Sequence, residues 1–420
     1  MDAIPLPGQA PLDLQAAMKD AAARMLDATP LPTIMTILDS GASAWCAPPP
    51  TKLEFPKDHG LHLACGPEWY WLTCTCDVVG TDEKINMVIC LQRERVLDPA
   101  VQARWGISDH DSQLVFSYAS VIHTTADGSH KYARRPNQVW PALSGEAIMQ
   151  ADPFVFSCGP DRMEGSVDVM PLRVFIDDRR DDILDMAIDV LCETDMPVKT
   201  AFFLQGDDGV TPPPRAGIYY SWPQLKVSGA VFVGGRTYMV EGKGWLDHEL
   251  MYTPCPDGPP FAPPPVWTPP VGIYGWTFCD LNFDNGDALV AAGFQTKKML
   301  TALPAPYGYY VTPVDGVWQK TYVVGVIQME AFLPLTAQCM LPVSWNLAMA
   351  GTGVEFVVEA TPFDDDGSFL SFNQSVQGET PCDLKLLKGG QVITGRGYCE
   401  SVGYEPPATY IARAREFLAR

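Results

Sequence analysis

The chain has 420 residues, of which 47% are hydrophobic and 19% are charged. This length predicts one large domain or two, and this composition excludes a disordered or collagen-like chain. Lysine and arginine number 29 against 50 aspartate and glutamate residues, which gives a formal net charge of −21. Nucleic acids and anionic membrane surfaces attract clustered positive charge, so we expect neither as a partner.

Targeting signals are also missing from the sequence. No apolar run approaches the roughly 20 residues that a membrane-spanning helix needs. The first residues, Met1 to Pro5, do not form the basic and then apolar pattern of a secretory signal. We therefore expect a cytoplasmic protein without a membrane span, and its oligomeric state stays unknown at this stage.

The N-terminal part changes from a helical to a strand pattern. Apolar residues recur at helical spacing over residues 12–26, which predicts an amphipathic helix within an N-terminal extension of residues 1–50. Ile85, Met87, Ile89 and Leu91 then recur at every second position, the period of a β-strand. Residues 177–192 fit either a helix or a strand. Comparable strand patterns cover residues 113–123, 167–176, 198–205, 225–233 and 236–244.

The second half repeats the strand pattern after a proline-rich break. Nine prolines lie between Pro254 and Pro270, too many for a helix or a central strand. We predict an N-terminal domain over 51–253, a linker over 254–270 and a C-terminal domain over 271–420. The predicted strands of the second domain are 272–283, 288–296, 322–333, 354–360 and 391–404, followed by a short helix over 409–418.

Cysteine and histidine spacing gives no sign of a metal site. Twelve cysteines are present without a Cys-x-x-Cys pair, and Cys74 and Cys76 share one face of a predicted strand, which is poor geometry for a disulfide. We expect buried free thiols, with a disulfide or a reactive thiol as the alternative. The six histidines show no zinc-ligand spacing, and the phosphate-binding, dinucleotide-binding and serine-nucleophile motifs are missing. We therefore predict no metal and no cofactor.

Three segments, taken in order, resemble a known family. They are residues 67–73 (PEWYWLT), residues 219–229 together with 242–249 (YYSWPQLKVSG and GKGWLDHE), and residues 395–404 (GRGYCESVGY). These segments resemble the CrtC/AttH-type double-lipocalin family, which includes carotenoid 1,2-hydratase (hydroxyneurosporene synthase) and many proteins described as secreted hydrolases. The fungal lipocalin-like Diels–Alderases are related more distantly. The resemblance implies an all-β fold of two tandem lipocalin-like antiparallel β-barrels, with short N- and C-terminal helices.

The same segments supply the candidate site residues. On a regular strand Asp247 and Glu249 face one side and His248 faces the other. The resemblance places this motif near Glu68 and the junction of the two domains. A carboxyl group buried among aromatic side chains has a raised pKa and can act as a general acid near neutral pH. The candidate catalytic residues are Glu68, Asp247, His248 and Glu249, and the candidate substrate-binding residues are Trp69, Tyr70, Trp71, Tyr219, Tyr220, Trp245 and Trp276.

Three functions remain open from the sequence. The first is a cofactor-independent isomerase or lyase, a cyclase, pericyclase or hydratase, acting on a hydrophobic terpenoid, polyene or polyketide in a pocket between the barrels. The second is a hydrolase of an ester or lactone, in which Asp247 or Glu68 activates water through His248. The third is a non-catalytic carrier of a hydrophobic small molecule. In each case the alternative for the polar residues is a buried hydrogen-bonded network that fixes strand geometry.

Overall fold

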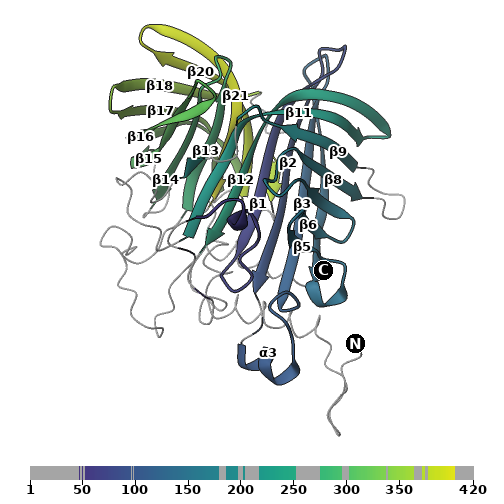
Figure 1. Cartoon of the computed structure of the whole chain (residues 1–420). Coiled ribbons are helices and arrows are strands. Elements are labelled where there is room, and N and C mark those ends of the chain that lie inside the picture. Colours follow the sequence, from purple (N-terminus) through teal and green to yellow (C-terminus); the bar gives the residue numbers. More distant parts are fainter. Residues whose placement is uncertain are drawn as a thin grey trace.

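Figure 1 shows the computed structural model of the chain, in which most described residues lie in strands. The structure describes residues 47, 50, 53–95, 97, 99–178, 186–196, 202–203, 217–251, 275–295, 302–336, 339–363, 371–373 and 377–402. The predicted helices over 12–26 and 409–418 and the linker over 254–270 lie outside these residues. The predicted all-β fold is confirmed.

The first half of the described chain forms one antiparallel sheet of twelve strands. Its order is β4-β3-β2-β1-β12-β11-β9-β8-β7-β6-β5, and β10 pairs with β11. The hairpin between β11 and β12 turns at Gly234 and Gly235, whose positive φ angles of 59° and 77° suit a two-residue turn. The strands are β1 (Glu68–Val78), β2 (Lys84–Arg95), β3 (Gln113–Thr124), β4 (His130–Pro141), β5 (Met149–Ala151), β6 (Phe154–Cys158), β7 (Asp161–Glu164), β8 (Leu172–Asp178), β9 (Met186–Glu193), β10 (Phe202–Phe203), β11 (Gly217–Val233) and β12 (Arg236–Met251).

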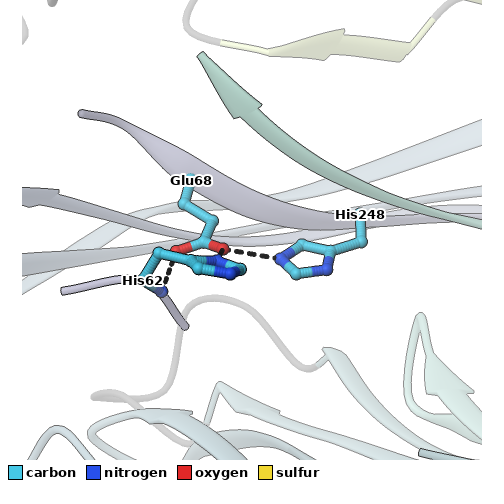
Figure 2. Close-up of side chains that lie close together, drawn as sticks. All are labelled: His62, Glu68 and His248. Carbon is cyan, nitrogen blue, oxygen red and sulfur yellow. Dashed lines mark hydrogen bonds and ion pairs between the residues drawn. The ribbon is translucent and has the colours of Figure 1, made fainter. Parts of the chain in front are cut away.

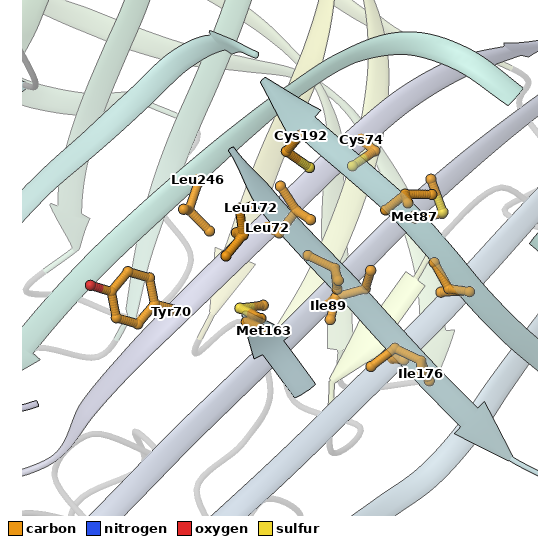
Figure 3. Close-up of a cluster of buried hydrophobic side chains, with 14 of the residues drawn as sticks. Tyr70, Leu72, Cys74, Met87, Ile89, Met163, Leu172, Ile176, Cys192 and Leu246 are labelled. Carbon is orange, nitrogen blue, oxygen red and sulfur yellow. The ribbon is translucent and has the colours of Figure 1, made fainter. Parts of the chain in front are cut away.

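This first sheet is curled around its own hydrophobic core. β3 and β4, at one end of the sheet, contact β6 near the other end. The inward side chains come from alternate positions of the strands, as the spacing of Ile85, Met87 and Ile89 predicts, and all three are fully buried. Figure 3 shows side chains of β1, β2, β7, β8, β9 and β12 meeting in this core, among them Leu72 and Leu246. The helical segments beside it are η1 (Lys57–His59), α3 (Pro99–Trp105) and η2 (Ala142–Ser144).

The second half forms a closed antiparallel barrel. Eight strands make up the barrel, which closes where β18 pairs with β20, and β19 adds to β20. Closure leaves the barrel strands without an unpaired edge, the arrangement found in lipocalins. The strands are β13 (Gly275–Phe283), β14 (Ala288–Gln295), β15 (Ala302–Val314), β16 (Val317–Thr336), β17 (Cys339–Gly351), β18 (Val354–Pro362), β19 (Ser371–Asn373), β20 (Gln377–Lys388) and β21 (Gln391–Val402).

The two sheets meet along the outer faces of β1, β11, β12, β13 and β21, in the middle of Figure 1. Thr73 Oγ1 donates a hydrogen bond of 2.5 Å to Asp280 Oδ2 across this junction. Gln224, at a bulge in β11, donates its side-chain amide to the backbone carbonyls of Phe283 and Asp287 at 2.8 and 2.7 Å. Side chains of both sheets form one apolar cluster there, which includes Tyr219, Trp245, Val290, Tyr309 and Trp318.

Most predicted strands coincide with observed ones, and a few differ. The pattern over 167–176 predicts too early a start, because β8 begins only at Leu172. The last part of the ambiguous segment 177–192 lies in the strand β9, in which every second residue is buried. Strands β4, β15, β17 and β20 lack a clear sequence pattern and were not predicted. The first sheet ends at Met251 and the barrel begins at Gly275, while the domain boundaries themselves stay a prediction.

Two further expectations concern cysteines and membranes. Cysteines 65, 74, 76, 90, 158, 192, 279, 382 and 399 are free and buried, as predicted. Burial raises the pKa of thiols such as that of Cys90, so the thiolate form that reacts with electrophiles is scarce at neutral pH. Within the described part of the chain, no helix has the length and apolar character needed to cross a bilayer.

Candidate functional site

The pairing of β1 with β12 brings the candidate residues together on two opposite faces. Tyr70 lies opposite His248 and Trp71 lies opposite Asp247 in this antiparallel pair. Because side chains alternate along a strand, Asp247 points to the junction with the barrel, whereas His248 points into the core of the first sheet. The structure therefore divides the predicted site residues into two groups, which we call the junction site and the interior site.

Asp247 is the centre of the junction site. Its Oδ1 atom accepts hydrogen bonds from the hydroxyl of Tyr219, from Ser221 Oγ at 2.7 Å and from Trp245 Nε1 at 2.5 Å. Burial raises the pKa of Asp247 to about 7, although these three hydrogen bonds favour the carboxylate and limit the rise. A carboxyl group with its pKa in this range can give up and take back a proton near neutral pH.

Further carboxyl groups lie near Asp247 in the junction site. Glu249 follows on the same face of β12, and burial together with the charges of Asp247 and Glu400 raises its pKa well above the ordinary value. Burial and the charge of Asp247 also raise the pKa of Asp280, which accepts hydrogen bonds from Thr73 and from the Tyr398 backbone. The junction site thus holds three carboxyl groups, those of Asp247, Glu249 and Asp280, whose pKa values are raised.

Aromatic side chains surround these carboxyl groups. Trp69 and Trp71 of β1 form an apolar cluster with Tyr118 of β3 and with Tyr398 of the barrel. Tyr219 packs edge to face on Phe278 of β13, with 5.5 Å between the ring centroids. The predicted substrate-binding residues Trp69, Trp71, Tyr219, Trp245 and Trp276 all belong to this face, and Trp276 donates its indole N–H to Glu400.

Glu68 is the centre of the interior site, shown in Figure 2. Its Oε2 atom accepts hydrogen bonds from Arg93 Nη2 at 2.6 Å and from the backbone N–H of His62 at 2.6 Å. Its Oε1 atom lies 2.7 Å from Nδ1 of His62 and 2.9 Å from Nε2 of His248. Both side chains of the Glu68–Arg93 ion pair have an exposed fraction of 0%.

A chain of hydrogen bonds extends the interior site from Glu68 to η1. Nδ1 of His248 lies 2.7 Å from the Tyr220 hydroxyl, and Nδ1 of His59 lies 2.7 Å from the same hydroxyl. Tyr70 stacks on the His248 ring at 4.1 Å and donates its hydroxyl to the His59 carbonyl at 2.7 Å. The predicted residues Glu68, Tyr70, Tyr220 and His248 therefore form one network that faces away from Asp247.

Charges in the interior site oppose the expected general-acid role of Glu68. Burial raises the pKa of Glu68, but the charges of His62 and Arg93 and the hydrogen bonds from His248 and His62 outweigh it, so the pKa lies well below the ordinary value. Burial lowers the pKa of His248 and brings that of His59 to about 3, so both imidazoles are neutral. A low pKa does not fit a general acid, so this role is disfavoured for Glu68, while its place among the candidate catalytic residues stays a prediction.

Comparison with known proteins identifies the family. The AttH-like family model matches residues 46–404 of the chain. The chain belongs to the AttH-like family. This result confirms the resemblance seen in the three sequence segments, and none of the curated proteins matches the chain in sequence.

Solved structures agree with this AttH-like fold. The structure of an AttH protein from Nitrosomonas europaea is 20% identical, has a TM-score of 0.59 and covers 86% of this chain and 99% of its own. Kievitone hydratase from Nectria haematococca matches with a TM-score of 0.46 and 12% sequence identity, and the match covers 86% of this chain and 94% of that chain. The structure of CghA with Sch210972 has a TM-score of 0.41 and 10% sequence identity, and the match covers 81% of this chain and 89% of that chain. At these low sequence identities, the reactions of the similar proteins cannot be assigned to this AttH-like chain.

The interior site of this AttH-like chain is also the place where a metal ion could be sought. Among the described residues, the candidate ligand atoms of His62, Glu68 and His248 lie within 4.8 Å of one another. A bound ion would lie about 2.0–2.2 Å from each ligand atom. Here the two nitrogens lie 2.7 and 2.9 Å from the carboxylate oxygen itself, the geometry of N–H···O hydrogen bonds. The arrangement is that of hydrogen bonds from the two imidazoles to the Glu68 carboxylate. A metal ion would fit here only if the imidazoles moved.

Several residues of the two sites escaped the sequence analysis. His59, His62 and Arg93 lie outside the three family-like segments, and no local spacing connects them with Glu68. Asp280 joins the junction site from the barrel, about thirty residues beyond Asp247 in sequence, and Glu400 was not among the candidate site residues. Side chains alternate along β1, so the sequence does predict that Glu68 and Trp69 point to opposite faces of the sheet. Only this division of the site residues into two faces could be predicted from the sequence.

Proposed function

We propose that this chain is a cofactor-independent enzyme of the isomerase or lyase type that acts on a hydrophobic small molecule at the junction site. The observation that supports this proposal is the Asp247 carboxyl group, with a pKa raised to about 7 between two sheets of aromatic side chains. A general acid works best when its pKa lies near the working pH, because it is then protonated and still gives its proton readily.

The geometry around Asp247 suits proton donation. The three hydrogen bonds from Tyr219, Ser221 and Trp245 all end on Oδ1, so they hold the carboxyl group in place and stabilise the carboxylate that forms after proton transfer. The proton then belongs on Oδ2, and in this proposal Oδ2 is the oxygen that faces the substrate. Protonation of an alkene or a carbonyl there, followed by capture of water or by ring closure, gives a hydratase or a cyclase.

Glu249 and the aromatic rings supply the remaining parts. Glu249 lies two residues from Asp247 on the same face and can exchange a proton with water or with the reacting intermediate. The rings of Trp69, Trp71 and Trp245 offer apolar surface for a terpenoid, polyene or polyketide and exclude water from the reacting atoms. A hydrolase in which Asp247 acts through His248 is disfavoured, because the two side chains point to opposite faces of the sheet.

The proposal can be tested by incubating the protein with a metabolite extract of its source in deuterated water. Wild type is compared with Asp247→Asn, which keeps a hydrogen-bond acceptor but has no proton to give. Asp189→Asn, on the exposed face of β9, is the matched control. We expect wild type and the control to form a product that is either one water heavier than the substrate or of the same formula, and Asp247→Asn to lose it. Protonation of an alkene carbon leaves one carbon-bound deuterium in this product, whereas protonation of a carbonyl oxygen leaves none. Recovery of every ligand unchanged from wild type would instead indicate a carrier.

A further inference from the structure

Two buried aromatic side chains that pack together inside the first sheet each carry a polar atom without a hydrogen-bond partner among the described residues. His59, at the end of η1, has an exposed fraction of 0%, and Trp222 of β11 has one of 3%. Among the described residues, none forms a hydrogen bond with Nε2 of His59 or with Nε1 of Trp222. The two ring centroids are 5.3 Å apart. Folded proteins rarely leave buried polar groups unpaired, and each such group calls for an explanation.

The hydrogen-bond network of the interior site fixes which of these atoms donates and which accepts. Because Glu68 is a carboxylate, Nε2 of His248 carries the proton and donates to it at 2.9 Å. Nδ1 of His248 then accepts the single proton of the Tyr220 hydroxyl, which lies 2.7 Å away, closer than the Asp58 carbonyl at 3.2 Å. Nδ1 of His59 must in turn donate to the Tyr220 oxygen. Nε2 of His59 is left as a bare lone pair.

This order of protons makes the two unpaired atoms complementary to a hydroxyl group. Nε2 of His59 can only accept a hydrogen bond, and the indole N–H of Trp222 can only donate one. A hydroxyl group is both a donor and an acceptor, so its hydrogen-bonding character complements both atoms. The hydrogen bonds that connect His59 through Tyr220 and His248 to Glu68 keep the proton of His59 on Nδ1.

The surroundings of the two atoms are aromatic. Phe55 stacks on the His59 ring with 4.3 Å between centroids, and Trp222 lies 5.1 Å from Tyr220. Tyr70 packs edge to face on Phe154 at 4.9 Å. Aromatic rings pack favourably on one another through offset or edge-to-face contacts. A hydroxyl group attached to a flat, unsaturated ring therefore suits this place better than one on a charged or sugar-like molecule.

We propose that the inside of the first sheet holds a second ligand site, which takes a small phenolic or enolic molecule whose hydroxyl group donates to Nε2 of His59 and accepts from Nε1 of Trp222. This site lies on the face of β11 and β12 opposite to Asp247 and does not depend on the proposed reaction. Its ligand is recognised as the neutral hydroxyl compound.

Calorimetric titration of the full chain with phenol and with benzene tests the proposal, because the two probes differ by the hydroxyl group alone. We expect Trp222→Phe, which removes the indole N–H and keeps an aromatic ring, to weaken phenol binding about tenfold, the effect of one lost hydrogen bond. Benzene binding should not weaken. Trp345→Phe is the matched control, because it removes another buried indole N–H without a partner, inside the barrel, and it should leave phenol binding unchanged.

A second measurement uses the wild-type protein and is independent of how the variants fold. In a nitrogen–proton NMR spectrum, phenol should shift one indole N–H resonance, and benzene should not shift it in the same way. The proposal is overturned if phenol shifts no indole resonance, or if Trp222→Phe binds phenol as wild type does. Because Asp247→Asn should bind phenol normally, failure of this proposal can be distinguished from failure of the proposed reaction.

Discussion

Asp247 and His248 are neighbours in sequence, yet their side chains serve different sites. The Asp247 carboxyl group accepts three hydrogen bonds at the junction with the barrel, whereas Nε2 of His248 lies 2.9 Å from Glu68 inside the first sheet. Alternation along β12 alone produces this division. Substitutions at the two positions should consequently change different properties of the protein, and the predictions below rest on this difference.

In the proposed reaction, activity should depend on the protonated form of Asp247. Since the pKa of this group is about 7, we expect kcat/KM to be constant below that pH and to fall about tenfold per unit above it. The initial rate of product formation between pH 5 and 9 measures this. A profile that rises with pH would show that a carboxylate, and not the acid, is the reactive form.

Asp247 should also make the stability of the fold depend on pH. Its pKa is higher in the folded state than the ordinary value of 3.8, so its proton stabilises the fold at low pH, and this contribution is lost as the pH rises through about 7. Relative to Asp247→Asn, wild type should lose about 2 to 4 kcal/mol of unfolding free energy between pH 4 and pH 8. Urea denaturation of both proteins at the two pH values gives this difference, and parallel pH curves would contradict the prediction.

Breaking the Glu68–Arg93 ion pair should cost far more than breaking an exposed one. Arg93→Met leaves the Glu68 carboxylate buried without its main partner, and we expect a loss of about 3 to 5 kcal/mol of unfolding free energy. Arg173→Met, in the exposed pair with Asp189, is the control and should cost less than about 1 kcal/mol. The double variant Glu68→Gln/Arg93→Met should lose less than the two single variants together, which urea denaturation can measure. Additive losses would mean that the two side chains act independently.

Gln224 should stabilise the contact between the sheet and the barrel. Its side-chain amide donates to the carbonyls of Phe283 and Asp287, so Gln224→Ala removes two hydrogen bonds across the junction and should cost about 1 to 3 kcal/mol, although each carbonyl keeps another donor. Gln150→Ala is a matched control, because the exposed Gln150 amide also donates to two carbonyls, but within its own hairpin. Denaturation followed by tryptophan fluorescence compares the two variants. Equal losses would show that the hydrogen bonds across the junction add nothing to stability.

Local patterns in the sequence were sufficient for many of the strands and for the faces on which the site residues of β12 lie. Alternation at Ile85, Met87 and Ile89 predicts β2, and the same rule places Asp247 and His248 on opposite faces of β12. Patterns failed for β15 and β17, which contain prolines, glycines and apolar residues on both faces and so lack a period of two. They also failed to show which carboxyl group keeps its proton, because Glu68 and Asp247 are both buried acids in family-like segments.

The sequence by itself determined an acidic, all-β chain of the AttH-like family with buried thiols, because composition, period and short motifs are local properties. The tertiary structure decided the chemistry of the two acids. It brings Arg93 and His62 to Glu68 and leaves Asp247 without a cation among its hydrogen-bond partners, so one pKa falls and the other rises to about 7. Charge and burial act through space, and residues distant in sequence become neighbours only when the strands pair.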